Sequence, residues 1–209
     1  MGKESSVVLA LDVTDRVKAL DIVEKTSEDL AAVKIGWPAI LALGKDFITE
    51  LKQKDIQVIA DLKLADIDNT TKLIVEQVLE AGADYVIGHP FVGKQSYELI
   101  DPKKLILVVE MSHPGAIDFI QPQTEEFCKM ARDMGVYGVV APATRPERVK
   151  QIRELLGPDI KIYSPGVGAQ GGSAKDVLEA GADFIIVGRA IYNSENPSNS
   201  VKEILKSLE

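Results

Sequence analysis

The segment "LEAGADYVIG" (residues 79–88) recurs as "LEAGADFIIVG" (residues 178–188), about half a chain length further on. Each copy is typical of a helix end, a glycine just beyond the helix C-terminus and a short buried strand. The repeat predicts a fold made of two similar halves. Because this helix-to-strand unit is common among α/β proteins, the match could also be a coincidence, and it indicates nothing about function.

Short apolar runs alternate with amphipathic stretches along the whole chain. Patterns such as "NTTKLIVEQVLEAG" (69–82) and "PERVKQIRELLG" (146–157) predict helices between the strands. The candidate strands are residues 7–11, 32–35, 57–62, 85–88, 105–109, 138–141, 161–163 and 184–187. Eight such repeats without a linker predict a single-domain (β/α)8 TIM barrel over residues 1–209. A doubly wound open sheet is the alternative, but so many repeats in a short chain favour closure.

The composition excludes some classes of partner. The chain of 209 residues is 45% hydrophobic and 27% charged, with a formal net charge of −8. That charge argues against binding to nucleic acid or to an anionic membrane, although it permits a small anionic ligand held locally. Cys128 is the only cysteine, no apolar run reaches membrane-spanning length, and the N-terminus lacks signal-peptide features. We therefore expect a cytoplasmic protein without disulfides.

In a TIM barrel, functional residues lie where the strands end. Reading these ends in order yields polar side chains at Asp12, Lys34, Asp61, Lys63, His89, Ser112 and His113. The densest group is "DLKLAD" (61–66), in which strand alternation should turn Asp61 and Lys63 to the same side.

Residue type and spacing leave three interpretations open for Asp61, Lys63, Asp66 and Lys34. They could be ordinary solvated ion pairs, or the two carboxylates could hold Mg²⁺. They could also form a proton-transfer site in which carboxylates keep Lys63 charged and ready to donate. His89 and His113 could each be a base or could brace a loop. The sequence has no convincing Ser/His/Asp triad and no His/Cys set for zinc.

Two segments near the C-terminus predict a phosphate site. "SPGVGAQGGSAKD" (164–176) is a glycine-rich loop leading to a helix with Ser173 as a possible N-cap, and "VGRAIY" (187–192) follows the last strand. Loops after strands seven and eight hold phosphate in many such barrels. The donors would be the Gln170 side chain, the Arg189 guanidinium and the amides of Gly166, Gly168, Gly171, Gly172, Gly188 and Arg189. A flexible loop beside a surface arginine is the alternative.

The chain resembles the orotidine 5′-phosphate decarboxylase family in its compact archaeal form. The segments that carry the resemblance appear in family order: "LALDV", "VKIGWP", "ADLKLADI", "MSHPGA", "SPGVGAQGG" and "VGRAIY". The Asp-x-Lys-x-x-Asp core is shared by a whole superfamily. The features that narrow the resemblance to this family are Lys34, the "MSHPGA" segment and Gln170. The resemblance implies conversion of orotidine 5′-monophosphate to UMP and CO2 in pyrimidine biosynthesis, without metal or organic cofactor.

The resemblance also implies a role for each site residue. Asp61 would crowd the substrate carboxylate and hold the lysines, and Lys63 would stabilise and protonate the carbanion. Asp66 and Thr70 would come from the partner subunit of a homodimer with shared active sites. Asp12 and Lys34 would bind the ribose, Ser112 the pyrimidine, and Gln170, Gly188 and Arg189 the phosphate. Further substrate contacts are expected from Ile67, Pro165, Gly166, Val167 and Gly168.

Two alternatives are weaker. A Mg²⁺-dependent hexulose-phosphate synthase or ketogulonate-phosphate decarboxylase of the same superfamily would place a glutamate ligand where this chain has Lys34. An ammonium there repels a divalent ion. A catalytically silent nucleotide-binding barrel is the other alternative, and the presence of Asp61 and Lys63 argues against it.

Overall fold

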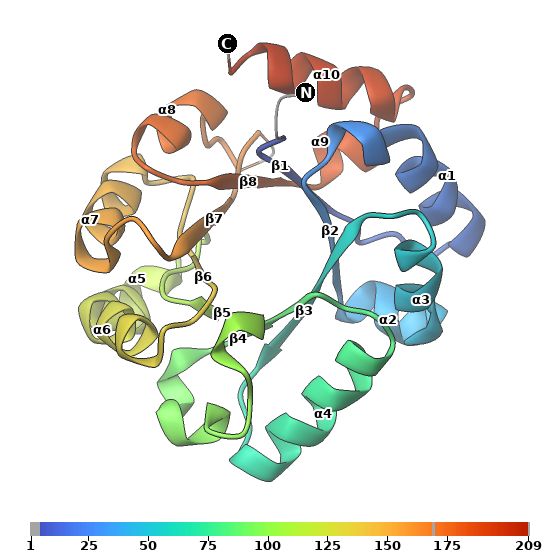
Figure 1. The fold of residues 1–209 in the computed structure, drawn as a ribbon. Helices are drawn as coiled ribbons and strands as arrows, with labels where there is room; N and C mark the ends of the chain where they lie inside the picture. Colours follow the sequence, from blue (N-terminus) through green and yellow to red (C-terminus); the bar gives the residue numbers. More distant parts are fainter. Residues whose placement is uncertain (1–4, 169, 209) are drawn as a thin grey trace.

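The computed structural model describes residues 5–168 and 170–208, and its strands form a closed parallel barrel ringed by helices (Figure 1). The strands are β1 (Val7–Ala10), β2 (Ala32–Gly36), β3 (Gln57–Leu64), β4 (Tyr85–Gly88), β5 (Leu105–Val108), β6 (Gly138–Val140), β7 (Lys161–Pro165) and β8 (Phe184–Val187). Each strand pairs with the next, and β8 closes the barrel by pairing with β1. The predicted TIM barrel is confirmed.

Helices connect the strands on the outside of the barrel (Figure 1). The α-helices are α1 (Arg16–Thr26), α2 (Trp37–Leu43), α3 (Asp46–Lys52), α4 (Asp68–Glu80), α5 (Ala116–Phe119), α6 (Thr124–Met134), α7 (Pro146–Leu156), α8 (Ala174–Glu179), α9 (Arg189–Tyr192) and α10 (Pro197–Lys206). Short 3-10 turns are η1 (Ser27–Asp29), η2 (Pro90–Val92), η3 (Lys94–Tyr97), η4 (Pro102–Lys104) and η5 (Gln121–Gln123). The connection after β4 consists of η2, η3 and η4, because proline and glycine interrupt it repeatedly.

Alternation along the strands divides the core into two layers. Side chains such as Ile59, Ile106 and Ile186 fill the barrel interior, whereas neighbours such as Val58 and Leu107 pack between barrel and helices. At the N-terminal ends of the strands, aromatic rings close the interior. Tyr85 stacks on Tyr137 and Tyr163 stacks on Phe184, with ring centroids 3.9 and 4.7 Å apart. The C-terminal ends carry the polar residues instead.

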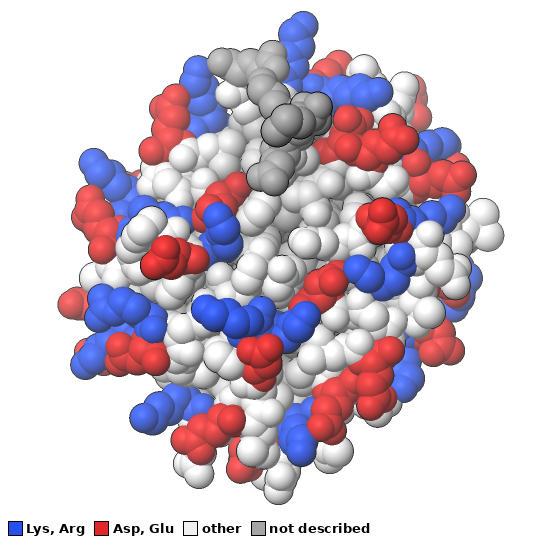
Figure 2. All heavy atoms as spheres, in the orientation of Figure 1, with Lys and Arg blue, Asp and Glu red and all other residues white. Residues whose placement is uncertain are grey.

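Acidic and basic side chains are interspersed over the face drawn in Figure 2. Among the residues that the structure describes, none of the helices has the length and apolar character needed to cross a membrane.

Candidate active site

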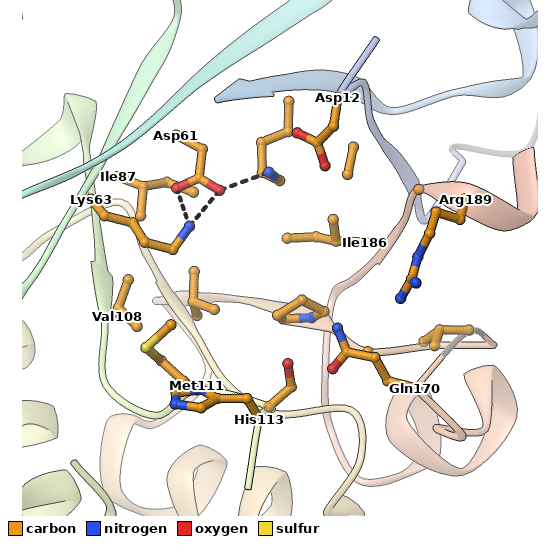
Figure 3. Close-up of a pocket in the computed structure, with 18 of the residues that line it drawn as sticks. Asp12, Asp61, Lys63, Ile87, Val108, Met111, His113, Gln170, Ile186 and Arg189 are labelled. Carbon is orange, nitrogen blue, oxygen red and sulfur yellow. Dashed lines mark hydrogen bonds and ion pairs between the residues drawn. The ribbon is translucent and has the colours of Figure 1, made fainter. Parts of the chain in front are cut away.

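A cavity of about 570 Å³ opens at the C-terminal ends of the strands (Figure 3). It collects residues that lie far apart in the sequence, from the end of β1 to the start of α9. The predicted site residues that line it are Asp12, Lys34, Asp61, Lys63, Ser112, His113, Pro165, Gly166, Val167, Gln170, Gly188 and Arg189. Most of the site residues predicted from the ends of the strands therefore lie around one cavity.

The cavity has an apolar floor that sequence reasoning did not single out. Ile87, Val108, Val140 and Ile186 form it, each near the end of a strand and turned inward, and Met111 joins them. The period of two along each strand could have identified these positions, because the last inward residue of a strand lies beneath the cavity. A flat heterocycle fits against such a surface better than a charged group does.

Three charged side chains meet on one side of the cavity (Figure 3). The Nζ of Lys34 lies 2.7 Å from Oδ2 of Asp61, and the Nζ of Lys63 lies 2.8 Å from Oδ1. Asp61 is 7% exposed, whereas the Lys63 side chain is 42% exposed. Asp61 and Lys34 therefore form a buried ion pair. The Lys63 ammonium, bound to Asp61, extends from this pair toward the space that a ligand would occupy.

Opposing effects set the charge of Asp61. Burial raises the pKa of its carboxyl group, but the adjacent Lys34 and Lys63 ammonium groups outweigh that effect and hold the pKa below its ordinary value. Asp61 is therefore a carboxylate at neutral pH. A carboxylate between two ammonium groups fixes both lysines in position.

Strand β3 leaves the regular ladder where it presents Lys63. Ala60 pairs with Val86 and Leu64 pairs with Gly88, so the residues between them bulge from the strand. Lys63 itself has a φ of 45°, a left-handed conformation that is uncommon outside glycine. Asp61 and Lys63 do face the same cavity as alternation predicted, but the bulge also contributes to the direction of Lys63. Such strain is often found at functional sites.

The opposite side of the cavity holds Arg189 and Gln170 (Figure 3). Arg189 begins α9 directly after β8, and the loop containing Gln170 precedes α8, which Ser173 caps as predicted by accepting a hydrogen bond from the amide of Asp176. Gly166 has a φ of 107°, and an added Cβ there would lie 3.2 Å from Cβ of Ser112. Glycine thus lets the loop after β7 pack against the segment that carries Ser112.

Asp66, Ile67, Thr70 and Gly168 do not line this cavity. Asp66 and Ile67 are exposed, and one Asp66 oxygen accepts a hydrogen bond from the amide of Ile67. Thr70 lies instead at a separate apolar hollow of about 310 Å³, beside Trp37 and Leu73. Within a single chain these residues are therefore separate from the charged cluster.

The two histidines differ. His113 lines the cavity and is exposed, whereas His89 is buried just after β4 and lies beside Phe91, with the two rings tilted and their centroids 5.1 Å apart. Burial lowers the pKa of His89, and the nearby Lys63 ammonium lowers it further. His89 is therefore neutral at physiological pH, so it adds no further positive charge beside the cluster of Lys34, Asp61 and Lys63.

The charged cluster of Lys34, Asp61 and Lys63 also bears on metal binding. Over residues 5–168 and 170–208, no three His, Cys, Asp or Glu side chains gather as a metal site would require. Asp61 already accepts hydrogen bonds from the ammonium groups of Lys34 and Lys63. A divalent cation would have to displace those two charges to reach the carboxylate.

Comparison with known proteins agrees with this geometry. The model of the "Orotidine 5'-phosphate decarboxylase / HUMPS family" matches residues 5–204. The chain is 56% identical to orotidine 5′-phosphate decarboxylase of Pyrococcus abyssi, covering 97% of this chain and 98% of that protein. The corresponding protein of Thermococcus kodakarensis is 53% identical, with coverage of 99% and 98%.

Solved structures match over the same extent. The enzyme from Pyrococcus horikoshii OT3 superimposes with a TM-score of 0.92 at 50% identity, covering 97% of this chain and 98% of that one. The orotidine 5′-monophosphate decarboxylase of Methanocaldococcus jannaschii, complexed with the inhibitor BMP, gives a TM-score of 0.93 at 42% identity, with coverage of 99% and 100%.

Proposed function

The chain belongs to the orotidine 5′-phosphate decarboxylase / HUMPS family, and we propose how its cavity carries out the reaction. The reaction is the conversion of orotidine 5′-monophosphate to UMP and CO2, a carboxy-lyase step of pyrimidine biosynthesis. The observation that carries the mechanism is the Lys34–Asp61–Lys63 cluster at the edge of an apolar floor.

Lys63 supplies the charge and the proton. When the bond between C6 of the pyrimidine and the carboxylate carbon breaks, CO2 leaves and the electron pair stays on C6. No electron sink is available in the ring, so fixed positive charge close to C6 must stabilise the carbanion. The Lys63 ammonium provides it and then transfers a proton from Nζ to C6, after which the neutral amine regains a proton from solvent.

Asp61 and Lys34 prepare Lys63 for that step. Asp61 contacts Nζ of Lys63 through both carboxylate oxygens, at 2.8 and 2.9 Å, which fixes the ammonium before substrate arrives. The same carboxylate would lie close to the substrate carboxylate and repel it, and this repulsion is relieved as CO2 forms. Lys34 balances the buried charge of Asp61, and with Asp12 it is available to the ribose hydroxyls.

The rest of the cavity positions the nucleotide. Arg189 and Gln170 would bind the phosphate together with the backbone amides of Gly166, Val167 and Gly188, while Ser112 would contact the pyrimidine. Because Arg189 and Gln170 line the cavity across from Lys63, the nucleotide can extend between the two sides with its base on the apolar floor. Binding energy gained at the phosphate then contributes to the barrier reduction at C6.

A homodimer would complete the site. Asp66, Ile67 and Thr70 do not line the cavity of their own chain, the Ile67 side chain is exposed, and Thr70 lies beside the exposed apolar side chains of Trp37 and Leu73. An apolar face of this kind suits contact with a second copy. Pairing through it would bring Asp66, Ile67 and Thr70 to the partner's cavity. A cytoplasmic location likewise remains a prediction from the sequence.

Exhaustive chelation tests the proposed mechanism against the Mg²⁺-dependent alternative. Treatment with EDTA followed by assay with orotidine 5′-monophosphate should leave the rate of UMP formation unchanged, because Lys63 supplies the charge that a metal would otherwise provide. Loss of activity that added Mg²⁺ restores would favour the metal-dependent relatives. Parallel release of UMP also separates an active enzyme from a silent nucleotide-binding barrel.

A further inference from the structure

A completely buried carboxylate lies next to the cavity without lining it. Glu110 is the second residue beyond the end of β5 and is 0% exposed. It precedes the β5 loop (residues 111–123), which carries Ser112 and His113 into the cavity and ends where α6 begins. The mechanism above gives Glu110 no task.

Donors surround both oxygens of Glu110. Oε1 accepts hydrogen bonds from Nε2 of Gln121 at 3.1 Å and from Nε of Arg145 at 3.2 Å. Oε2 accepts hydrogen bonds from the hydroxyl of Thr124 at 3.0 Å and from Nε of Arg148 at 2.9 Å, and Nη2 of Arg148 lies 2.8 Å away. A buried carboxylate persists only with such complete pairing, so the arrangement is rigid.

These contacts join the two ends of the β5 loop. Glu110 precedes the loop, whereas Gln121 and Thr124 lie at its far end, so a single carboxylate ties the start of the loop to its finish. Arg145, held by Glu110, also donates to the carbonyl oxygen of Met111, the residue before Ser112.

The next carbonyl along the loop is fixed from the same side. The carbonyl oxygen of Ser112 accepts a hydrogen bond from the hydroxyl of Thr144 at 3.0 Å, and Thr144 directly precedes Arg145. The backbone that aims Ser112 is therefore fixed at successive carbonyls.

We propose that Glu110 is a positioning residue for recognition of the pyrimidine base. Glu110 links the two ends of the β5 loop and holds Arg145 in place. It thereby orients Ser112 toward the position of the pyrimidine. This inference rests on the proposed placement of Ser112 at the pyrimidine. The ribose and phosphate groups are held by other elements, at the ends of β1, β2, β7 and β8, so a defect in Glu110 should affect the base selectively.

Replacing the carboxylate by the isosteric amide tests this assignment. Glu110→Gln should weaken binding of UMP about tenfold while changing the affinity for ribose 5-phosphate less than about twofold, because the charge-assisted bonds that Arg145 and Arg148 make beside the β5 loop are weakened and the ribose and phosphate contacts are not. The KM for orotidine 5′-monophosphate should rise with it. A merely structural role would lower the thermal midpoint and leave the ratio of the two affinities unchanged, and that result would overturn the proposal.

Asp183→Asn is the matched control. Asp183 is a partly buried carboxylate that also pairs with an arginine, Arg153, but it lies at the N-terminal end of β8. Its variant should lose stability without any change in the affinity ratio. An equal change in the ratio would show that general loosening, and not the β5 loop, explains Glu110→Gln, and this too would overturn the proposal.

Two further variants keep the test decisive. Thr124→Val removes one donor at the far end of the loop at nearly constant volume, and it should reduce UMP affinity about threefold with ribose 5-phosphate unaffected. If Glu110→Gln does not fold, an unchanged ratio in Thr124→Val overturns the proposal.

Ser112→Ala should change the ratio of the UMP and ribose 5-phosphate affinities as well. If it does not, the placement of Ser112 is wrong. If it does while Glu110→Gln has no effect, only the role of Glu110 fails.

Discussion

The two copies of the repeated segment have the same structure where each strand begins. In the first, the amide of Asp84 donates to the carbonyl of Val58, and the Asp84 carboxylate accepts from the amide of that residue at 2.8 Å. In the second, Asp183 makes the same pair of hydrogen bonds with Ile162, the carboxylate accepting at 2.9 Å. Each aspartate thus joins its own strand to the preceding one at the N-terminal end.

The glycines of the two copies also match. An added Cβ at Gly82 would lie 2.8 Å from Cγ of Lys52, and one at Gly181 would lie 2.9 Å from Cγ of Arg153. In both copies the aliphatic stem of a basic residue crosses the glycine and its charged end reaches the aspartate. The predicted two-fold repeat is therefore present in the side-chain contacts as well as in the sequence.

The copies diverge where their strands end. After β4, the hydroxyl of Tyr97 lies 2.8 Å from the carbonyl oxygen of His89, and the Tyr97 ring packs against Gly88. After β8, Arg189 faces the cavity and its guanidinium is available to a ligand. The same unit can therefore end in a packed aromatic or in a binding group. The N-terminal ends of the strands stabilise the barrel, and the C-terminal ends hold the chemistry.

Removing the central charge at the C-terminal ends should have the largest effect. Lys63→Ala should lower kcat by at least about a hundredfold, because general acid catalysis contributes about that much or more. The thermal midpoint should hardly change, since Asp61 keeps its buried contact with Lys34. Steady-state assay beside thermal unfolding measures both quantities. Lys54→Ala, which removes an exposed lysine paired with Glu24, is the control and should leave kcat unchanged. A Lys63→Ala enzyme within about tenfold of the parent would contradict the assignment of Lys63.

Removing the guanidinium at the end of β8 should have the next largest effect. Arg189→Ala should raise KM for the nucleotide by roughly 10- to 100-fold, the loss expected for charge-assisted hydrogen bonds. Gln170→Ala should act in the same direction but more weakly. The nucleoside orotidine, which lacks the phosphate, should be affected far less by either change. Comparing the two substrates in each variant checks this.

Tyr97→Phe is the matched control at the end of β4. It removes a buried hydroxyl that packs at the end of the first copy's strand, and it should cost stability without altering the preference for nucleotide over nucleoside. Equal losses on both substrates in Arg189→Ala would show that the two strand ends share a structural role.

Changes at the N-terminal ends should have smaller effects and should act on stability. Asp183→Ala leaves Arg153, Lys161 and the Ile162 amide without their carboxylate, and should cost about 2 kcal/mol, or roughly 4–8 °C in the thermal midpoint. Asp84→Ala should cost about half as much, because the Asp84 carboxylate has two partners among the described residues, the Lys52 ammonium and the Val58 amide. Both variants should keep the parent kcat at temperatures where they are folded. A tenfold fall in kcat with an unchanged midpoint would refute the division between the two ends.

The sequence predicted the eight strands because their periodicity is local. It also predicted the Asp61–Lys63 pair, since residues two apart on a strand face the same way. It did not predict that β3 would extend through Lys63 to Leu64, because a bulge depends on the neighbouring strand.

Glu110 shows the limit of local patterns most clearly. Its partners follow at 121, 124, 145 and 148, and no short motif links these positions. Only the closed barrel brings them around one carboxylate. The position of Asp66 outside its own cavity is likewise a result of tertiary structure, since three residues of chain could have returned it to Lys63.

Chain mixing tests whether Asp66 serves the partner's site, and its expected signal is the smallest. Lys63→Ala and Asp66→Ala homodimers should each be nearly inactive, because every site lacks one essential group. In a mixed dimer with a two-fold axis, one site carries both defects and the other carries neither. Equal amounts unfolded and refolded together should form about half mixed dimers and so restore roughly a quarter of all sites. If Asp66 served its own chain, every site would keep one defect. Mass spectrometry confirms the heterodimer, and no recovery in its presence would reject a shared site.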